Sequence, residues 1–212
     1  MIENIHWLGH DSFRLDGSST VYIDPWKLPA GAPSADLILV THDHFDHFSP
    51  DDIARVATPR TTLVGPASVT AQVVGVAALT LSAGETATVG GVTVTAVPAY
   101  NIDKFRRPGE LFHPLAAGGL GYIVELDGRR IYHAGDTDAI PEMREVRCDV
   151  ALLPVSGTYV MTAEEAAEAC QMISATAVVP MHFGDIVGTS ADAARFAGLC
   201  GIPVAVLPLE EG

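Results

Sequence analysis

The sequence predicts an α/β fold (α+β in some schemes) in which two β-sheets pack face to face with helices on their outer sides. Three observations support this prediction. Residues 5–24 are rich in alternating strand-like segments, residues 36–40 form a short and largely apolar run, and strands alternate with helices from residue 149 onward. Two facing sheets with external helices would bury the apolar faces of all these elements. No linker is visible, so we expect a single domain over residues 1–212.

The first half of the chain is expected to consist mainly of strands. Ser49 and Pro50 mark the start of a helix, with a capping hydroxyl followed by proline at the first helical position. A second helix is expected over residues 66–74. The expected strands are residues 5–8, 13–15, 20–24, 36–40, 61–65, 86–89 and 92–97.

The second half changes from strands to alternating strands and helices. Asp127 and Gly128 form a hairpin turn between strands over residues 121–126 and 129–133. The capping box from Thr162 to Glu165 opens a helix that is expected to reach Ile173. The remaining expected elements are strands 149–155, 177–180 and 203–207 and a helix over residues 189–199.

Composition limits the classes of partner. The formal net charge is −14, which argues against a nucleic-acid partner because phosphate binding requires a basic surface. No apolar stretch approaches the roughly 20 residues of a membrane span, and the N-terminus has no signal-peptide pattern. Three widely spaced cysteines suggest reduced thiols and a cytoplasmic protein. The sequence is compatible with a homo-oligomer.

A cluster of metal-binding residue types follows the apolar run at residues 36–40. Residues 42–47 read His-Asp-His-Phe-Asp-His, so three of the eight histidines lie in this window. Imidazole and carboxylate together are typical ligands of zinc, manganese or iron. A solvated, histidine-rich loop is the alternative, but such a loop would not be expected directly after a buried strand. The window therefore predicts a metal site.

Other polar residues also follow predicted strands. Sites in α/β sheets form at the carboxyl ends of strands, so these residues are expected to meet the cluster. Alone, Asp136 would be assigned to a turn and His182 to a hydrogen-bonded core edge. The residues at these strand ends are Asn101, Asp136, Ser156, Thr158, Tyr159 and His182.

The segment Thr41–His47 matches the His-x-His-x-Asp-His motif of the metallo-β-lactamase fold superfamily. The resemblance extends along nearly the whole chain, through residues 7–10, 23–25, 132–137 and 180–182. The sequence most resembles the branch that includes ascorbate 6-phosphate lactonase and an N-acylphosphatidylethanolamine-hydrolysing phospholipase D. These motifs are highly specific for fold and metal site and weakly specific for substrate.

The resemblance implies a four-layer αββα sandwich with a dinuclear site, most simply of zinc, with Mn²⁺, Fe²⁺ or Ni²⁺ as alternatives. Asp136 would bridge the two ions, and Asp24 would hold a ligand imidazole in the required tautomer. The remaining implied ligands are His42, His44 and a third histidine for one ion, and Asp46, His47 and His182 for the other.

The third histidine is missing from the segment in which the family usually has it, residues 98–102. Three possibilities remain open. His113 could reach in from the following loop, Asn101 could ligate through its amide oxygen, or the first position could be only partly occupied. We favour His113, because imidazole binds these ions better than a neutral amide.

A basic segment near this gap suggests the kind of substrate. Lys104, Arg106 and Arg107 lie within four positions of a strongly acidic chain. They could be solvated charges on an exposed loop. They could also form a lid whose guanidinium groups bind a phosphate or carboxylate. We therefore expect a small anionic substrate, with Asn101 and Thr158 as further candidate contacts.

The resemblance implies a metal-dependent hydrolase of esters, lactones or phosphodiesters. Two ions would lower the pKa of a water so that hydroxide attacks the substrate, and Asp46 could steer it as well as ligate. His10, or a residue of the 156–159 loop, could protonate the leaving group. A flavin-dependent di-iron oxidoreductase is disfavoured because position 44 is histidine rather than glutamate. A non-catalytic metal-binding scaffold or sensor is the other alternative.

Overall fold

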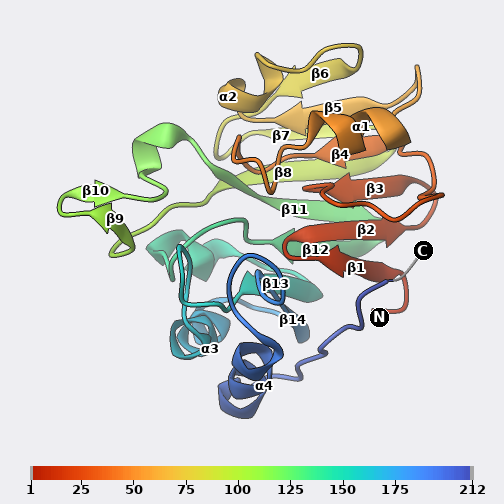
Figure 1. The fold of residues 1–212 in the computed structure, drawn as a ribbon. Helices are drawn as coiled ribbons and strands as arrows, with labels where there is room; N and C mark the ends of the chain where they lie inside the picture. The colour runs from red at the N-terminus through yellow and green to blue at the C-terminus, as the bar shows by residue number, and fades with distance from the viewer. Residues whose placement is uncertain (1, 211–212) are drawn as a thin grey trace.

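Two six-stranded sheets face each other, and the main helices lie outside them (Figure 1). The computed structural model describes residues 2–210. The first sheet has the order β1 (Ile5–Gly9), β2 (Ser12–Asp16), β3 (Thr20–Ile23), β4 (Leu37–Leu39), β5 (Thr62–Gly65) and β6 (Ala77–Thr80). The second has the order β14 (Ala177–Met181), β13 (Val150–Pro154), β12 (Arg129–His133), β11 (Leu120–Leu126), β8 (Val92–Pro98) and β7 (Thr86–Val89). The predicted sandwich is confirmed.

The run at residues 36–40 is buried on both sides, as its composition predicts. Leu37 and Leu39 belong to the core between the sheets. Ile38 and Val40 belong to a second core on the outer face of the first sheet, with α1 (Pro50–Val56) and α2 (Ala67–Thr70). Because β4 is covered on both faces and paired with β3 and β5, its carboxyl end is a rigid base for the loop that follows.

Two longer helices accompany the second sheet. They are α3 (Ala163–Met172) and α4 (Ser190–Leu199), and both begin with a capping box, at Thr162 and Thr189. They lie side by side at the end of the sandwich that holds β13 and β14 (Figure 1). The sulfurs of Cys170 on α3 and Cys200 after α4 are 3.0 Å apart, and both residues are free thiols.

Two predicted elements are wrong. The helix expected over residues 66–74 is only the short α2, since valines and Gly75 follow it and the chain turns toward β6, which was not predicted. The strand expected over residues 203–207 is reduced to one bridge between Val178 and Val204. Pro203 and Pro208 lack the N–H groups that a longer ladder needs.

The basic segment forms a hairpin rather than an irregular loop. It consists of β9 (Phe105–Arg107) and β10 (Glu110–Leu111), and it extends away from the sandwich (Figure 1). A short 3₁₀ turn, η1 (Leu115–Ala117), then leads into β11, while a second, η2 (Pro141–Glu145), follows β12. His113 lies between β10 and η1, so the hairpin returns the chain toward the end of β4.

Candidate metal centre

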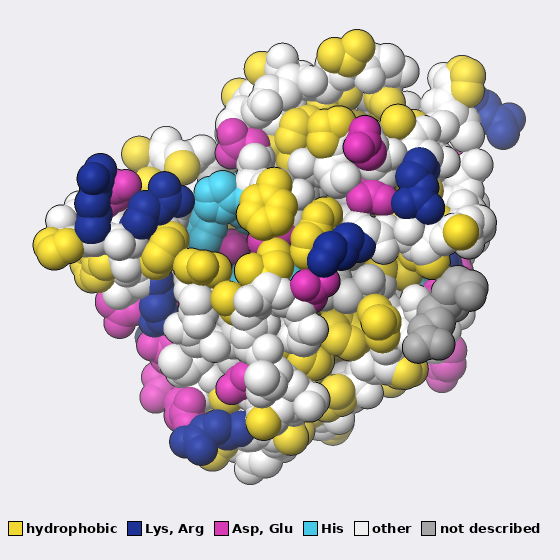
Figure 2. Space-filling model, in the orientation of Figure 1, with side chains coloured by type: hydrophobic (Ala, Val, Ile, Leu, Met, Phe, Trp, Pro, Cys, Tyr) yellow, Lys and Arg dark blue, Asp and Glu magenta, His cyan; other side chains and the backbone are white. Residues whose placement is uncertain are grey.

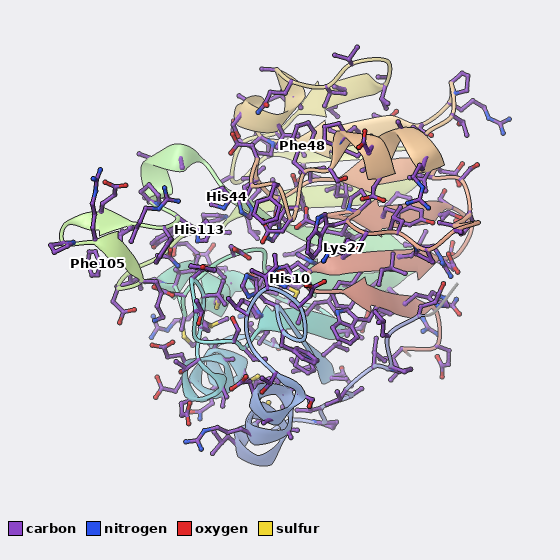
Figure 3. All side chains as sticks on the ribbon, in the orientation of Figure 1. His10, Lys27, His44, Phe48, Phe105 and His113 are labelled. Atoms are coloured by element: carbon purple, nitrogen blue, oxygen red, sulfur yellow. The ribbon has the colours of Figure 1, made fainter. Side chains whose placement is uncertain are left out.

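The strand ends bring the metal-binding side chains to one edge of the sandwich. The His42–His47 loop follows β4, Asp136 follows β12, and His182 follows β14. His10 comes from the turn after β1, and His113 from the chain beyond β10. Figure 3 shows His10, His44 and His113 near one another at the centre of the view, although they are far apart in sequence.

The first group consists of three histidines whose ring nitrogens converge. His42 Nε2 is 2.9 Å from His44 Nδ1, and His113 Nε2 is 3.2 Å from the same nitrogen. These three atoms could hold one metal ion. The structure thus places His113, and not Asn101, beside the first two histidines.

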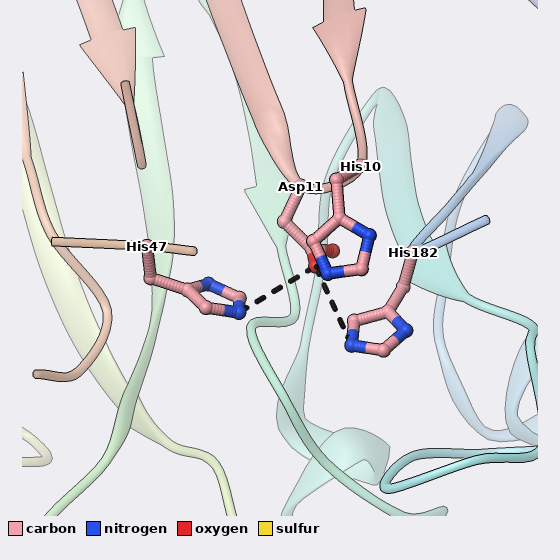
Figure 4. A group of neighbouring side chains, drawn as sticks. All are labelled: His10, Asp11, His47 and His182. Atoms are coloured by element: carbon pink, nitrogen blue, oxygen red, sulfur yellow. Dashed lines mark ion pairs between the residues drawn. The ribbon is translucent and has the colours of Figure 1, made fainter. Parts of the chain in front are cut away.

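The second group combines histidines with a carboxylate that the sequence did not single out. It contains His10, Asp11, His47 and His182, all of them buried, with ligand atoms within 4.8 Å of one another (Figure 4). Asp11 Oδ2 lies 3.7 Å from His47 Nε2 and 3.8 Å from His182 Nε2. Asp11 directly follows His10 at the end of β1, which is the positional signal that could have identified it.

Asp136 lies between the two groups and contacts both. Its Oδ2 is 3.3 Å from His113 Nε2 and 4.0 Å from His42 Nε2. The same carboxylate is 3.4 Å from His182 Nε2 and 3.5 Å from His47 Nε2. This is the position of a carboxylate that can bridge two metal ions.

Several buried polar atoms at this centre have no hydrogen-bond partner. They include both carboxylate oxygens of Asp11, Oδ1 of Asp136 and Nε2 of His47 and His182. Unpaired buried polar groups of this kind each cost about 1–3 kcal/mol. Bound cations would compensate for them, and imidazole with carboxylate is a suitable donor set for divalent metals. The described residues therefore fit a metal centre.

The opposite nitrogens of three of these rings are held by neighbouring residues. Asp24 Oδ2 is 2.8 Å from His47 Nδ1, and Ser156 Oγ is 2.8 Å from His182 Nδ1. Thr41 Oγ1 donates to Asp24 and lies 3.0 Å from His42 Nδ1, which can therefore donate to it. Such contacts fix each ring with Nε2 facing the centre. Sequence reasoning anticipated Asp24 in this role but assigned none to Thr41.

Asn101 holds His113. Its Oδ1 accepts a hydrogen bond from the backbone N–H of His113 at 2.8 Å and lies 3.1 Å from His113 Nδ1. Its amide Nδ2 donates to the carbonyl of Tyr159 and to Asp138. Asn101 is thus not among the converging ligand atoms, and its contacts are those of a residue that orients an imidazole.

We expect Asn101→Ala to weaken binding at the first metal position by about 10–100-fold, the usual loss when a partner of a ligand histidine is removed. The alanine leaves His113 Nδ1 without its acceptor, so the ring can rotate away. Calorimetric metal titration would measure the change. Gln72→Ala, which removes an exposed amide far along the chain, is the control. Unchanged affinity in Asn101→Ala would contradict this assignment.

Burial and neighbouring charges lower the pKa of some of these histidines and raise the pKa of others. Burial, together with the neighbouring His47, holds the pKa of His42 well below its ordinary value, and burial also lowers the pKa of His113. Burial acts the same way on His182, but Asp136 and Asp11 outweigh it and raise its pKa to about 9. Asp136 and Asp24 likewise raise the pKa of His47. His182 is therefore protonated at neutral pH until metal displaces its proton.

Metal binding should accordingly tighten as pH rises from about 6.5 to about 9, because His182 must lose a proton before it can ligate. In the metal-free protein the effect on stability has the opposite sign. The raised pKa of His182 stabilises the fold fully below pH 6.5, and this contribution is lost as pH rises through 9. Titrations and melting curves of the metal-free protein between these pH values would test both trends. A metal affinity independent of pH would contradict them.

Asp46 lies at the rim of the second group, beside its member His10. Asp46 Oδ2 is 3.3 Å from His10 Nε2 and 3.9 Å from His47 Nε2. Burial opposes the shift, but the contact with His10 and the charge of His47 lower the pKa of Asp46. His10 is buried and does not line the cavity, a position that does not suit a proton donor to a leaving group.

A cavity of about 390 Å³ opens over the centre. His44, His113, Asp46 and Asp136 form its polar part. Figure 2 shows histidine surface surrounded by apolar side chains in a hollow of this face, with basic side chains nearby. The remaining described lining residues are Phe45, Arg106, Phe112, Tyr159 and Ile186.

Of the predicted substrate contacts, only Arg106 lines this cavity. Its guanidinium carbon lies 5.5 Å from the centre of the Phe112 ring. Arg107 is exposed and paired with Glu110 at 2.6 Å, while Thr158 is exposed outside the cavity lining. The next residue, Tyr159, takes the place expected of Thr158. The sequence predicted Tyr159 among the strand-end residues and in the 156–159 loop, but not among the substrate contacts.

Comparisons with known proteins agree with this geometry. The model of the β-lactamase superfamily domain matches residues 4–182. A UPF0173 metal-dependent hydrolase of Methanoculleus marisnigri is 39% identical over 183 residues, covering 84% of this chain and 79% of the relative. Its counterpart in Thermococcus onnurineus is 32% identical and covers 98% and 96%. The chain therefore belongs to the β-lactamase superfamily and has the metallo-β-lactamase fold.

Solved structures give the same result. A protein of Parabacteroides distasonis, described as a metal-dependent hydrolase, superposes with a TM-score of 0.84 and 32% identity over 97% of this chain and 93% of its own. Igni18, a metallo hydrolase of Ignicoccus hospitalis, has a TM-score of 0.75 and 24% identity over 98% and 95%. At that identity, the second likeness concerns the fold alone.

Proposed function

We propose that this protein is a dinuclear metal-dependent hydrolase that acts on an ester, lactone or phosphodiester of a small anionic substrate. The observation that carries the proposal is the meeting of two groups of converging ring nitrogens at one carboxylate, Asp136, beneath an open cavity. Two adjacent divalent ions are a common device for hydrolysis. The relatives, which are named metal-dependent hydrolases, support the same class of reaction.

The first ion would be held by His42, His44 and His113, and Asp136 would be shared. The second would be held by His47 and His182, with Asp46 at its rim. Zinc suits the imidazole-rich set best, with Mn²⁺, Fe²⁺ and Ni²⁺ as alternatives. When bound, such ions polarise the electrophile and lower the pKa of the attacking water.

The residues of the cavity have separate tasks in this proposal. Arg106 binds the anionic group of the substrate through its guanidinium. Phe45 and Phe112 pack against the rest of the substrate and keep water away from the reacting bond. Asp46, whose lowered pKa keeps it ionised, accepts a hydrogen bond from the attacking water and orients it. The hydroxyl of Tyr159, which also lines the cavity, is assigned the donation of a proton to the leaving oxygen.

A substrate panel tests the proposal. Esters, lactones and phosphodiesters with and without an anionic group would be offered to the metal-loaded protein, the chelated protein and the variants His42→Ala and Asp46→Ala. We expect hydrolysis of at least one class by the loaded protein and its loss in the other three samples. Hydrolysis that persists in both variants would show that the activity arises elsewhere. Tight binding of two ions without any hydrolysis would favour a scaffold or sensor.

Arg106→Ala should raise KM for anionic substrates about 10–100-fold, because a charge-assisted hydrogen bond contributes about 1.5–3 kcal/mol. Arg107→Ala is a matched control from the same hairpin, since Arg107 is exposed and already paired with Glu110. Its KM should be unchanged. Neutral substrates should be hydrolysed equally well by both variants. A KM that rises equally for Arg106→Ala and Arg107→Ala would point to a general effect of hairpin charge.

Two further proposals concern the cellular location of the protein and its binding to nucleic acid. Within residues 2–210, the helices are all too short or too polar to cross a membrane. We propose a cytoplasmic location, which reduced thiols favour. We also propose that nucleic acid is not a partner, because the chain carries a strong net negative charge.

A further inference from the structure

Asp11 is a buried carboxylate that the ligand sets proposed above leave without a task. Its side chain is fully buried, and neither of its oxygens has a hydrogen-bond partner. A buried ionised carboxylate is tolerated only when it is paired or coordinates a metal. In the metal-free protein the imidazoles of His47 and His182 are the ion-pair partners of Asp11, and a bound cation would take over that role.

The carboxylate faces the second group of ligands. Asp11 Oδ2 lies 3.6 Å from His10 Nε2, 3.7 Å from His47 Nε2 and 3.8 Å from His182 Nε2 (Figure 4). Each distance is too long for a hydrogen bond. Atoms about 2.1 Å from a common ion are roughly 3.0–3.5 Å apart, so these spacings are close to those of ligands that share one cation.

The backbone around Asp11 is fixed relative to these ligands. The carbonyl of Asp11 lies 2.9 Å from His133 Nε2. The carbonyl of the preceding residue, His10, accepts hydrogen bonds from the backbone N–H of His182 at 3.1 Å and from Trp7 Nε1 at 3.0 Å. A residue held on both sheets in this way can present its carboxylate without further reorganisation.

We propose that Asp11 is an additional ligand of the second metal position and makes this position prefer harder divalent cations such as Mn²⁺. The inference rests on the two-metal function proposed above. The first position has three ring nitrogens and shares only Asp136, whereas the second has the ring nitrogens of His10, His47 and His182 and three carboxylates around it, Asp11, Asp46 and Asp136. Carboxylate oxygen suits Mn²⁺ better than imidazole does, while imidazole suits Zn²⁺. The two positions are therefore chemically unequal.

The test is a titration of the metal-free, full-length protein with Mn²⁺ and, separately, with Zn²⁺. Calorimetry gives the number and affinity of bound ions, and electron paramagnetic resonance counts bound Mn²⁺ independently. We expect the original protein to bind two ions. Asp11→Asn should bind one ion with unchanged affinity and the second at least about 100-fold more weakly for Mn²⁺, with a smaller loss for Zn²⁺. Asp43→Asn removes an exposed carboxylate beside the same site and should match the original protein.

The first ion serves as an internal measure of folding, because its ligands do not include Asp11. If Asp11→Asn loses both ions, Asp11→Ser is measured; loss of both ions there too would overturn the proposal in favour of a structural role. Two ions bound by Asp11→Asn with unchanged affinity would also overturn it. Equal losses for Mn²⁺ and Zn²⁺ would overturn the preference. Failure of the original protein to bind two ions would refute the proposed function itself, whereas the outcomes above leave that function standing.

Discussion

Replacing Asp136 with asparagine should abolish hydrolysis almost completely, with kcat/KM falling by roughly a thousandfold or more. Metal polarisation contributes several kcal/mol to such reactions, and each 1.36 kcal/mol corresponds to about tenfold in rate. Asp136 is the one described carboxylate that approaches histidines of both groups, at 3.3 Å from His113 Nε2 and 3.4 Å from His182 Nε2. Its loss should disturb both ions at once.

The measurement pairs kinetics with metal content. Because asparagine keeps the shape of aspartate but not its charge, the fold should survive, and circular dichroism would verify this. Asp149→Asn provides a control carboxylate outside the site, since Asp149 accepts a hydrogen bond from the backbone N–H of Arg130. An Asp136→Asn variant that retains two ions and normal kcat/KM would rule out the bridging role.

Removing His113 should reduce metal stoichiometry from two ions to one, or weaken the first ion by at least about 100-fold. His113 Nε2 is 3.2 Å from His44 Nδ1, and Asn101 directs the ring toward that point. Without this imidazole the first position has only His42, His44 and the shared Asp136. Hydrolysis that needs both ions should fall with the loss of the first.

Metal counting on His113→Ala gives the result directly. His6→Ala is the control, because His6 pairs with Asp16 and Glu210 away from the centre. The second ion should remain bound in His113→Ala, and its retention separates a local effect from unfolding. Two ions bound with unchanged affinity would eliminate His113 as a ligand of the first ion. That result would favour a first position that lacks a third histidine.

Local patterns allowed much of this fold to be predicted. The apolar run at β4, the capping boxes at Thr162 and Thr189 and the turn at Asp127-Gly128 each depend on neighbours in sequence, and the structure contains all of them. The missed elements depend on distant contacts. Strand β6 is an edge strand whose four residues are exposed and which, among the described residues, pairs with β5 alone, so its short apolar segment carries no clear period.

The site divides in the same way. The His42–His47 window stands out because the ligand types are adjacent in sequence, and Asp136 and His182 stand out because they follow buried strands. Asp11 was not singled out, since an aspartate after a strand is most often part of a turn. Its importance arises from its burial and from the rings that it faces, which only the folded chain defines.

The hydroxyl of Thr41 has a consequence for how the protein loads its metals. It donates to Asp24, lies 3.0 Å from His42 Nδ1 and is 3.4 Å from His47 Nδ1, so one side chain touches an imidazole of each metal position. One hydroxyl therefore orders an imidazole of each metal position. Its removal would free both rings at once, so the loading of both positions, rather than of one, should depend on Thr41.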